Sequence, residues 1–446
     1  MFRVVILASL AFASSAAAAP KNVVLMIADD LGMEVGCYGD KAAKTPHIDR
    51  LAASGTRYTH GFASVASCSP SRATILTGMP THMCGQYGLA HAEHNVFSFK
   101  KVKGLPALLA PAGYRSAVIS KLHVQPKEVY PFDEEIAANG KNVAQIAEKA
   151  KDFLDRTGDK PFFLLVGFTD PHRAAKGFGN DAKLPASIPV VKFDPKTLPV
   201  PNHLPDTADV RADLAEYYQS VARLDHGVGL VMKALEDAKR LDDTLVIFLS
   251  DNGIPFPGAK TTLYDAGVHL PLIIRFPGRK AEVNETLAGW TDLAPTILDW
   301  AGVKPPANLP GRSLLDAKSD AEAVFGSHQY HEATMYYPMR MVRTRTHKYI
   351  LNLAHGLEYP HASDLWGSDS WQGILKRGDA MMGQRSVKSF LTRPKEELYD
   401  VVADPAEVKN LAGEPGRERV LNELRAKLAA WRKATNDPWL IKDKHE

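Results

Sequence analysis

The 446-residue sequence contains only three cysteines, Cys37, Cys68 and Cys84, so it is not built on a disulfide framework. It also lacks an excess of charge of one sign, because 54 lysines and arginines face 51 aspartates and glutamates. A net charge of +3 without a basic run argues against nucleic-acid binding. No segment reaches the length of apolar sequence that a membrane-spanning helix needs. The composition is instead typical of a soluble globular protein with a full hydrophobic core.

The first 19 residues are predicted to be a secretory signal. Arg3 provides a basic start, residues 4–12 are apolar but too short to cross a bilayer, and residues 16–19 are alanines that suit a cleavage site. A buried N-terminal helix is the alternative interpretation. We expect an exported protein, periplasmic or secreted, or lysosomal in a eukaryotic host, that does not bind membranes.

Apolar runs separated by helical stretches recur along the chain. Predicted strands cover residues 22–28, 116–120, 161–168, 244–249 and 270–276. The clearest helix carries apolar residues three and four positions apart over residues 214–235, with Asp206 or Thr207 as its cap. Alternating strands and helices predict an α/β fold with a mostly parallel sheet.

Polar side chains come soon after the end of each of the first four strands. In chain order they are Asp29 and Asp30, then Lys121 and His123, then Asp170 and His172, then Asp251 and Asn252. Because ligands of such folds bind beyond the carboxyl ends of the strands, the pattern predicts one site at this edge.

The pattern changes near residue 346. Residues 347–353 predict an exposed strand of alternating character, residues 397–402 predict another strand, and a final helix carries Leu421, Leu424, Leu428 and Trp431. No structure is assigned to residues 356–389. We therefore predict a signal at 1–19, a catalytic domain at 20–345 and a smaller C-terminal α+β subdomain at 346–446.

One short motif indicates the chemistry. Residues 68–78 read CSPSRATILTG and match C-x-P-S-R-x-x-x-L-T-G at every fixed position, so the chain resembles the type I sulfatases. The resemblance implies an alkaline-phosphatase-like sheet flanked by helices, a small C-terminal antiparallel sheet, and oxidation of Cys68 to formylglycine by a formylglycine-generating enzyme. Pro70 suits a first helical turn, which would place residue 68 at an anion-attracting helix N-terminus. The alternative for a lone cysteine is a small buried apolar residue.

A metal site is predicted from the acidic strand ends. Asp29, Asp30, Asp251 and Asn252 offer hard oxygen ligands, which suit Ca²⁺ or Mg²⁺ better than zinc. The resemblance implies calcium as the usual ion, with the converted Cys68 as a fifth ligand.

The resemblance also assigns roles to basic residues. Lys121 and His123 would hold and deprotonate the formylglycine hydrate, and His172 would face the leaving group and give it a proton. Arg72 adds a forked cation for sulfate oxygens, and Lys260 would bind sulfate too. Taken singly, each of the two lysines could equally well be a solvated surface residue, and each of the two histidines a hydrogen-bonded residue of the core. The full set of predicted substrate-binding residues is Arg72, Lys121, His172, Lys260, His331, Glu332 and Arg340.

Segments outside the motif resemble the sulfamidase branch of the family. They are residues 250–257 (SDNGIPFP), 326–332 (GSHQYHE), 337–340 (YPMR) and 437–439 (DPW). This implies removal of sulfate from N-sulfated glucosamine in heparan-type glycans. Lys260 stands where the animal sulfamidases are expected to carry arginine, and the segment after His172 is shorter.

Three other functions are compatible with the same core residues. They are an O-sulfatase acting on 6-O-sulfated sugars or aryl sulfates, a phosphodiesterase or phosphonate hydrolase, and a calcium-stabilised glycan-binding protein without activity. The complete set of catalytic candidates argues against the last. The sequence leaves open a dimer and whether Cys37 and Cys84 are bonded or free.

Overall fold

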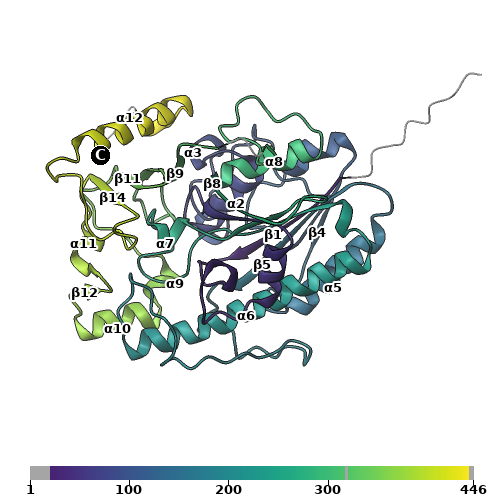
Figure 1. Ribbon diagram of the computed structural model, residues 1–446, viewed down its shortest axis with the longest axis horizontal. Helices are drawn as coiled ribbons and strands as arrows, with labels where there is room; N and C mark the ends of the chain where they lie inside the picture. Colours follow the sequence, from purple (N-terminus) through teal and green to yellow (C-terminus); the bar gives the residue numbers. More distant parts are fainter. Residues whose placement is uncertain (1–20, 317–319, 441–446) are drawn as a thin grey trace, which may run out of the picture.

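A computed structural model describes residues 21–316 and 320–440, so the predicted signal at residues 1–19 lies outside the described residues. Its main element is an eight-stranded sheet with the order β4-β3-β5-β1-β6-β7-β2-β8 (Figure 1). The strands are β1 (Asn22–Asp29), β2 (Thr56–Phe62), β3 (Arg115–Ser120), β4 (Glu134–Ile136), β5 (Phe162–Pro171), β6 (Thr244–Ser250), β7 (Leu272–Arg275) and β8 (Glu282–Gly289). Only β7 runs antiparallel to its neighbours among these strands, which confirms the predicted mostly parallel α/β sheet.

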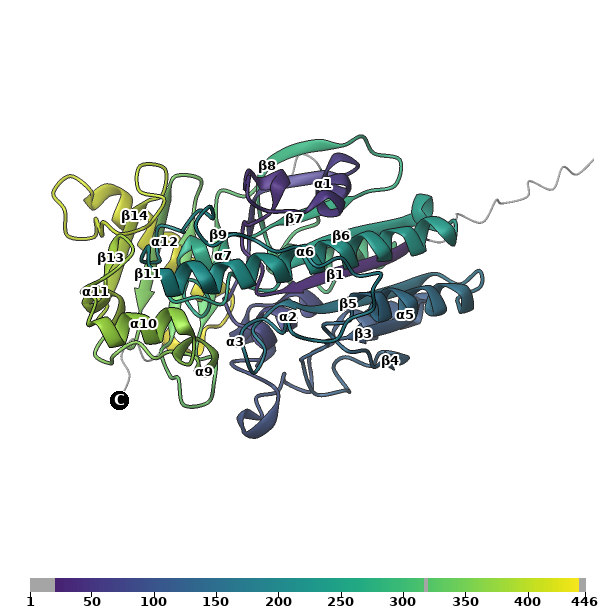
Figure 2. The same ribbon diagram turned by 90° about the horizontal axis from the view of Figure 1, so that it is seen from below.

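Helices cover both faces of this sheet (Figures 1 and 2). Val23, Leu25 and Ile27 of β1 face one hydrophobic layer, and the residues between them face the other. Both faces of β1 are therefore buried, which explains its unbroken apolar sequence. The first layer is covered by α2 (Cys68–Thr77), α3 (Thr81–Cys84), α4 (Leu105–Leu109) and α8 (Leu293–Trp300). The second is covered by α1 (Pro46–Ala53), α5 (Val143–Arg156) and α6 (Ala208–Asp237).

The longest of these helices, α6, matches its sequence pattern. It begins after Thr207, one of the two predicted caps, although the Thr207 side chain makes no capping hydrogen bond. Its buried stripe includes Leu214, Val221, Val228 and Leu235. The spacing of seven residues between them returns to the same face after two turns, so this stripe anchors α6 on the sheet.

A second, four-stranded antiparallel sheet occupies the C-terminal part of the chain, as predicted. Its order is β14-β11-β10-β9, with β9 (Val324–His328), β10 (Met339–Arg343), β11 (His347–Asn352) and β14 (Glu396–Asp400). Helix α12 (Glu418–Ala434) packs Leu421, Leu424 and Leu428 against it.

The expected exposure of residues 347–353 was wrong. Lys348 in β11 is fully buried, because Asp265 at 2.5 Å and Glu407 at 2.8 Å neutralise its ammonium. Asp265 begins the short helix α7 (Asp265–Val268). Alternating polar residues are typical of a solvent-exposed strand, but here they include a lysine in an internal ion pair.

Residues 356–389, left without assignment, form ordered structure. They contain α9 (Ser363–Trp366), α10 (Asp369–Arg377), the paired β12 (Met381–Met382) and β13 (Arg385–Ser386), and the start of α11 (Val387–Leu391). None of the helices in residues 21–316 and 320–440 has the length and apolar character needed to span a bilayer. Cys37, Cys68 and Cys84 are all free thiols.

The two sheets share one hydrophobic core. Met341 in β10, Ile350 in β11 and Tyr399 in β14 belong to the same buried cluster as Leu25 of β1. The second sheet also takes β9 and β10 from before residue 346. The division of the chain at residue 346 therefore stays a prediction.

Stability is expected to fall on acidification because of buried histidines. Burial, aided by nearby arginines, lowers the pKa of His82 and of His328 to about 3. The ordinary histidine pKa is about 6.5, so the unfolded chain binds more protons between these values, and stability present above about pH 6.5 is lost as the pH falls towards 3. At about pH 5 each histidine costs on the order of 2 kcal/mol. Urea unfolding of the protein and of His328→Gln at about pH 6.5 and about pH 5 measures this loss. If the free energy of unfolding fell equally with pH in both proteins, the assignment to His328 would be refuted.

Candidate active site

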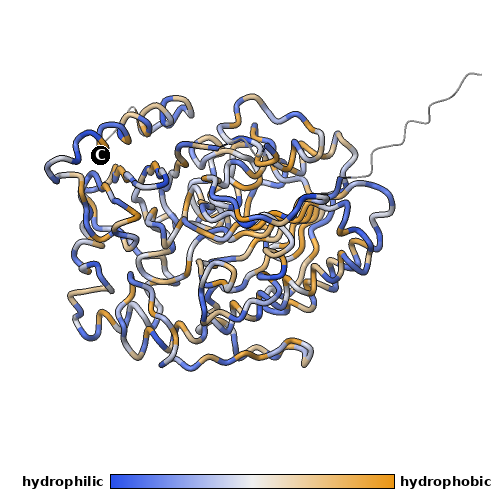
Figure 3. The backbone as a smooth tube through the Cα atoms, viewed as in Figure 1, coloured by the Kyte–Doolittle hydropathy of each residue, from blue (hydrophilic) through white to orange (hydrophobic). Residues whose placement is uncertain are grey.

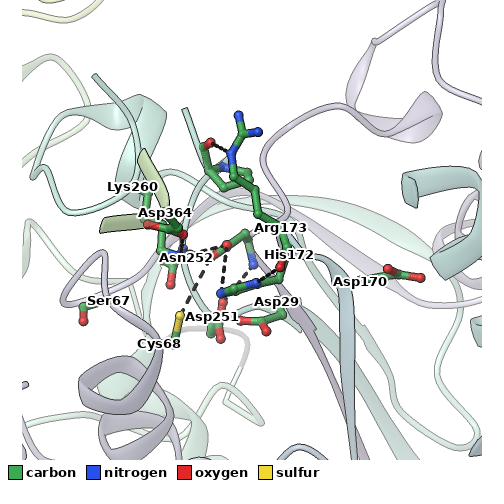
Figure 4. Close-up of polar contacts among 12 residues, drawn as sticks. Asp29, Ser67, Cys68, Asp170, His172, Arg173, Asp251, Asn252, Lys260 and Asp364 are labelled. Atoms are coloured by element: carbon green, nitrogen blue, oxygen red, sulfur yellow. Dashed lines mark hydrogen bonds and ion pairs between the residues drawn. The ribbon is translucent and has the colours of Figure 1, made fainter. Parts of the chain in front are cut away.

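Two pairs of polar residues lie side by side where β1 and β6 end (Figure 4). The backbone N–H of Asp30 donates to Asp251 Oδ1 at 3.1 Å, and Asn252 Nδ2 donates to Asp30 Oδ1 at 2.6 Å. All four residues, Asp29 included, are fully buried. The parallel pairing of the strands thus brings together the four predicted metal ligands.

Cys68 is the first residue of α2, as predicted from Pro70. Its Sγ lies 3.8 Å from Asp30 Oδ1, and single side-chain atoms of Asp29, Asp30, Cys68 and Asp251 all lie within 4.8 Å of one another. Burial raises the pKa of the Cys68 thiol well above its usual value. An unmodified thiol here stays protonated, so it is a poor nucleophile.

This cluster fits a divalent cation. Asp29 Oδ1 and Asn252 Oδ1 are buried and have no hydrogen-bond partner in the part of the chain that is described. Buried polar atoms normally have a partner, so these two oxygens, of which Asp29 Oδ1 lies 3.7 Å from Arg72 Nη2 in an ion pair, support a cation site here. The donors are oxygens, as Ca²⁺ and Mg²⁺ require. With a single thiol and no imidazole in the tight group, the set is a poor zinc site.

Three cations surround the carboxylates: Arg72 and Lys260 are buried, and the side chain of Lys121 is 16% exposed. Arg72, one turn after Cys68 on α2, donates from Nε to Asp251 Oδ2 at 2.8 Å. Lys121, just after β3, pairs with Asp29, and together with His172 and Arg72 it outweighs burial and holds the pKa of Asp29 well below its usual value. Lys260 Nζ lies 2.9 Å from Asp30 Oδ2. These cations are placed to share their charge with an anion that enters the cluster.

His123 lies at the same edge with one nitrogen unused. Its Nε2 lies 2.5 Å from His91 Nδ1, while its Nδ1 is buried and unpartnered among the described residues. Burial, followed by the charge of Lys121, lowers the pKa of His123 well below the ordinary value. The lowered pKa favours the neutral ring, and in the tautomer that carries its hydrogen on Nε2 the unpartnered Nδ1 can accept a proton.

His172 follows β5 and points into the cluster (Figure 4). Its Nδ1 lies 2.5 Å from the carbonyl oxygen of Arg173, and since a carbonyl only accepts, Nδ1 carries the proton. Nε2 lies 3.8 Å from Asp30 Oδ2, on the side of the carboxylates. Burial and Lys260 lower the pKa of His172.

Asp364 was missed by the sequence analysis. It lies in α9, within the stretch left unassigned, and its Oδ2 is 2.7 Å from Lys260 Nζ. Although burial opposes it, the charge of Lys260 lowers the pKa of Asp364. A single aspartate between Ser363 and Leu365 carries no local signal, because only tertiary packing brings it to this edge.

His331 and Glu332, predicted to bind substrate, form hydrogen bonds to residues that lie next to the site. His331 Nδ1 lies 2.7 Å from the Oγ of Ser67, the residue that precedes α2. Glu332 Oε1 accepts from the backbone N–H of Ser363 at 2.8 Å and from its hydroxyl at 2.6 Å. Glu332 thereby fixes the start of α9 and with it Asp364.

Arg340 is not brought to this cluster. Its guanidinium is fully buried and donates twice to Asp437, at 2.8 Å each, and to the carbonyls of His328 and Met339. These partners leave the side chain no exposed surface for a sugar. The structure thus gives Arg340 a structural contact in place of the predicted substrate contact.

Replacing Arg340 with alanine is expected to lower stability by about 3–5 kcal/mol, because Asp437 would remain buried with only Arg432 as a counter-charge. Chemical denaturation measures the loss. The kcat/KM of the folded fraction should stay within about threefold, since no reacting group is touched. A large fall in kcat/KM without loss of stability would return Arg340 to the substrate site.

Comparison with known families gives two matches along the chain. The sulfatase family model matches residues 21–303. A second model, described as N-sulphoglucosamine sulphohydrolase, C-terminal, matches residues 259–358. The first match contains all the predicted metal ligands and Cys68, and the second contains Lys260, His331 and Glu332.

Individual relatives agree with these matches. The chain is 42% identical to human N-sulphoglucosamine sulphohydrolase, over 95% of this chain and 92% of that protein. A protein solved in complex with its substrate D-glucosamine-2-N,6-O-disulfate superposes with a TM-score of 0.69 at 21% identity, covering 96% and 100% of the two chains. A phosphonate monoester hydrolase of Agrobacterium radiobacter superposes with 0.68 at 19% identity, covering 93% and 96%. The last two likenesses show a shared fold.

Proposed function

Because the chain belongs to the sulfatase family, we propose that it removes sulfate from the nitrogen of N-sulfated glucosamine in heparan-type glycans. The observation that carries this proposal is Cys68 at the N-terminus of α2, buried among four oxygen-ligand residues and three cations. Similarity to human N-sulphoglucosamine sulphohydrolase along nearly the whole chain supports nitrogen as the site of cleavage.

Two groups would complete the site. We infer that a formylglycine-generating enzyme converts Cys68, and that Asp29, Asp30, Asp251, Asn252 and the converted residue hold Ca²⁺ or Mg²⁺. When bound, the cation and the hydrated aldehyde supply a hydroxyl nucleophile that is activated near neutral pH. The buried oxygens Asp29 Oδ1 and Asn252 Oδ1, which accept no hydrogen bond from the described residues, support this assignment.

The cations of the chain would neutralise the sulfate. Arg72, Lys121 and Lys260 already lie around the carboxylates, so their charges are in place before a ligand enters. Charges fixed in advance, in a site that excludes water, stabilise the transition state of sulfuryl transfer without reorganisation.

Two histidines would move protons. His172, held by the carbonyl of Arg173 through Nδ1, presents Nε2 to the leaving nitrogen and would protonate it as the N–S bond breaks. His123 presents its free Nδ1 and would accept a proton from the second hydroxyl of residue 68 as inorganic sulfate leaves that residue. The lowered pKa of His172 suits it to release a proton once a bound sulfate has favoured its charged form.

The test is a comparison of two substrates. Protein co-produced with a formylglycine-generating enzyme is incubated with calcium and either glucosamine N-sulfate or glucosamine 6-O-sulfate, and the inorganic sulfate released is measured. Release from the N-sulfate is expected to exceed release from the 6-O-sulfate by at least about 100-fold, which corresponds to roughly 2.7 kcal/mol.

The other outcomes identify the alternatives. Release from the 6-O-sulfate alone would keep the sulfatase chemistry and overturn the choice of nitrogen. Release from neither, with formylglycine found at residue 68 by mass spectrometry, would favour phosphate or phosphonate ester hydrolysis, which the shared fold allows.

Export through residues 1–19 and the division into 20–345 and 346–446 belong to the same proposal. The exported protein would then meet heparan fragments as its natural ligand. Both a monomer and a dimer agree with this proposal. Mass measurement of the mature protein checks the cleavage near residue 19.

A further inference from the structure

Asp364 lies between two groups that would touch different parts of the substrate. Its Oδ2 pairs with Lys260, which would bind the sulfate. One of its oxygens lies within 4.8 Å of a ring nitrogen of His172 and a carboxylate oxygen of Asp30 (Figure 4). The atom that joins sulfate to sugar must lie between the sulfate-binding lysine and the leaving-group histidine, which places it beside Asp364.

The second carboxylate oxygen of Asp364 is uncommitted. Oδ1 is shielded from solvent and has no hydrogen-bond partner among the described residues, while the side chain as a whole is 22% exposed. A buried acceptor without a donor is costly, so such an atom marks a position where a ligand donor belongs. Asp364 thus lies at the edge of the cluster, and its Oδ1 is available to accept a hydrogen bond from a ligand.

The two kinds of sulfated sugar differ at the joining atom. A sulfamate has a nitrogen that carries one hydrogen, whereas a sulfate ester has an oxygen that carries none. A carboxylate accepts a hydrogen bond from the first and repels the lone pairs of the second.

We propose that Asp364 selects sulfate on nitrogen over sulfate on oxygen by accepting a hydrogen bond from the S–N–H group. This rests on the proposed function, because it assumes that Lys260 and His172 flank the sulfate and the leaving group. Glu332 holds Ser363 and so positions the carboxylate for this contact.

The variant Asp364→Asn separates this role from a structural one. The asparagine oxygen is expected to stay on Lys260, which can only donate, so the amide NH₂ would turn towards the substrate. That NH₂ opposes the hydrogen of a sulfamate but can donate to the bridging oxygen of an ester. The variant Asp369→Asn makes the same chemical change at an exposed position in α10 and serves as the control.

The experiment measures binding, so that it does not depend on turnover. Cys68→Ala protein in saturating calcium is titrated calorimetrically with glucosamine N-sulfate and with glucose 2-O-sulfate, which places an ester oxygen where the sulfamate nitrogen lies. The N-sulfate is expected to bind about 10- to 100-fold more tightly. Adding Asp364→Asn should remove most of this preference, and adding Asp369→Asn should leave it unchanged.

Each outcome decides the matter. No preference with Asp364 present, or a preference that survives Asp364→Asn, would overturn the proposal. Equal weakening of the binding of both sugars by Asp364→Asn would also overturn it, by showing that Asp364 acts only on Lys260. Failure of the proposed function is seen separately, as absence of sulfate release from glucosamine N-sulfate by the formylglycine-containing enzyme.

Discussion

Replacing Cys68 with alanine is expected to lower sulfate release by at least about 10⁴-fold, because the side chain that would become the nucleophile is removed while the rest of the site stays in place. The charges of Arg72, Lys121 and Lys260 remain, so the variant should still bind inorganic sulfate. Sulfate release and sulfate binding are measured on the same preparation.

The matched control for this loss is Cys84→Ala. Cys84 is equally buried in α3, but its Sγ contacts the carbonyl of Thr81 and no group of the site. Its removal should cost some stability and leave kcat/KM within about twofold. If Cys68→Ala kept most of its activity, a covalent role for residue 68 would be wrong.

Replacing Asp251 with alanine is expected to weaken calcium binding by more than about 100-fold. Loss of a residue that only hydrogen-bonds to a metal ligand typically costs roughly 10- to 100-fold, and here a direct ligand is removed. Wild-type protein should gain about 2.7 kcal/mol of stability at a calcium concentration 100 times its Kd, and a chelator should abolish the gain. In Asp251→Ala the unfolding midpoint should no longer respond to either. Calorimetry and thermal unfolding measure the two effects independently of activity.

The exposed Asp299→Ala in α8 controls for loss of a carboxylate as such, and it should retain the full response to calcium. Unchanged calcium affinity in Asp251→Ala would contradict the ligand assignment. Arg72 also loses its partner in this variant, so sulfate binding is measured in parallel to separate the two effects.

Most of the central sheet could be predicted from sequence because its strands are buried on both faces. β1, β3, β5 and β6 all appear as unbroken apolar runs. β2 and β8 were missed because they carry polar residues on half-exposed faces, and glycine interrupts β2. The antiparallel direction of β7 was not predicted, since direction depends on how the connections run through space.

The candidate site divides in the same way. Asp29, Lys121, His172 and Asp251 lie at the carboxyl ends of strands that run parallel, so their meeting at one edge follows from the predicted α/β fold. Asp364 reaches that edge from a separate helix and leaves no trace in local sequence. Arg340 was misplaced because a resemblance in sequence does not reveal which carboxylate a buried arginine meets.

The core shared by the two sheets has a consequence for how the chain can be divided. A fragment ending near residue 345 would lose Ile350 and Tyr399 from the cluster that also contains Leu25, and would expose the apolar face against which they pack. Helix α9 with Asp364 would be lost as well. We therefore expect that the segments before and after residue 345 do not fold independently of each other. A destabilising change in β11 or β14 is expected to disturb the core beneath the catalytic residues, however far it lies from Cys68 along the sequence.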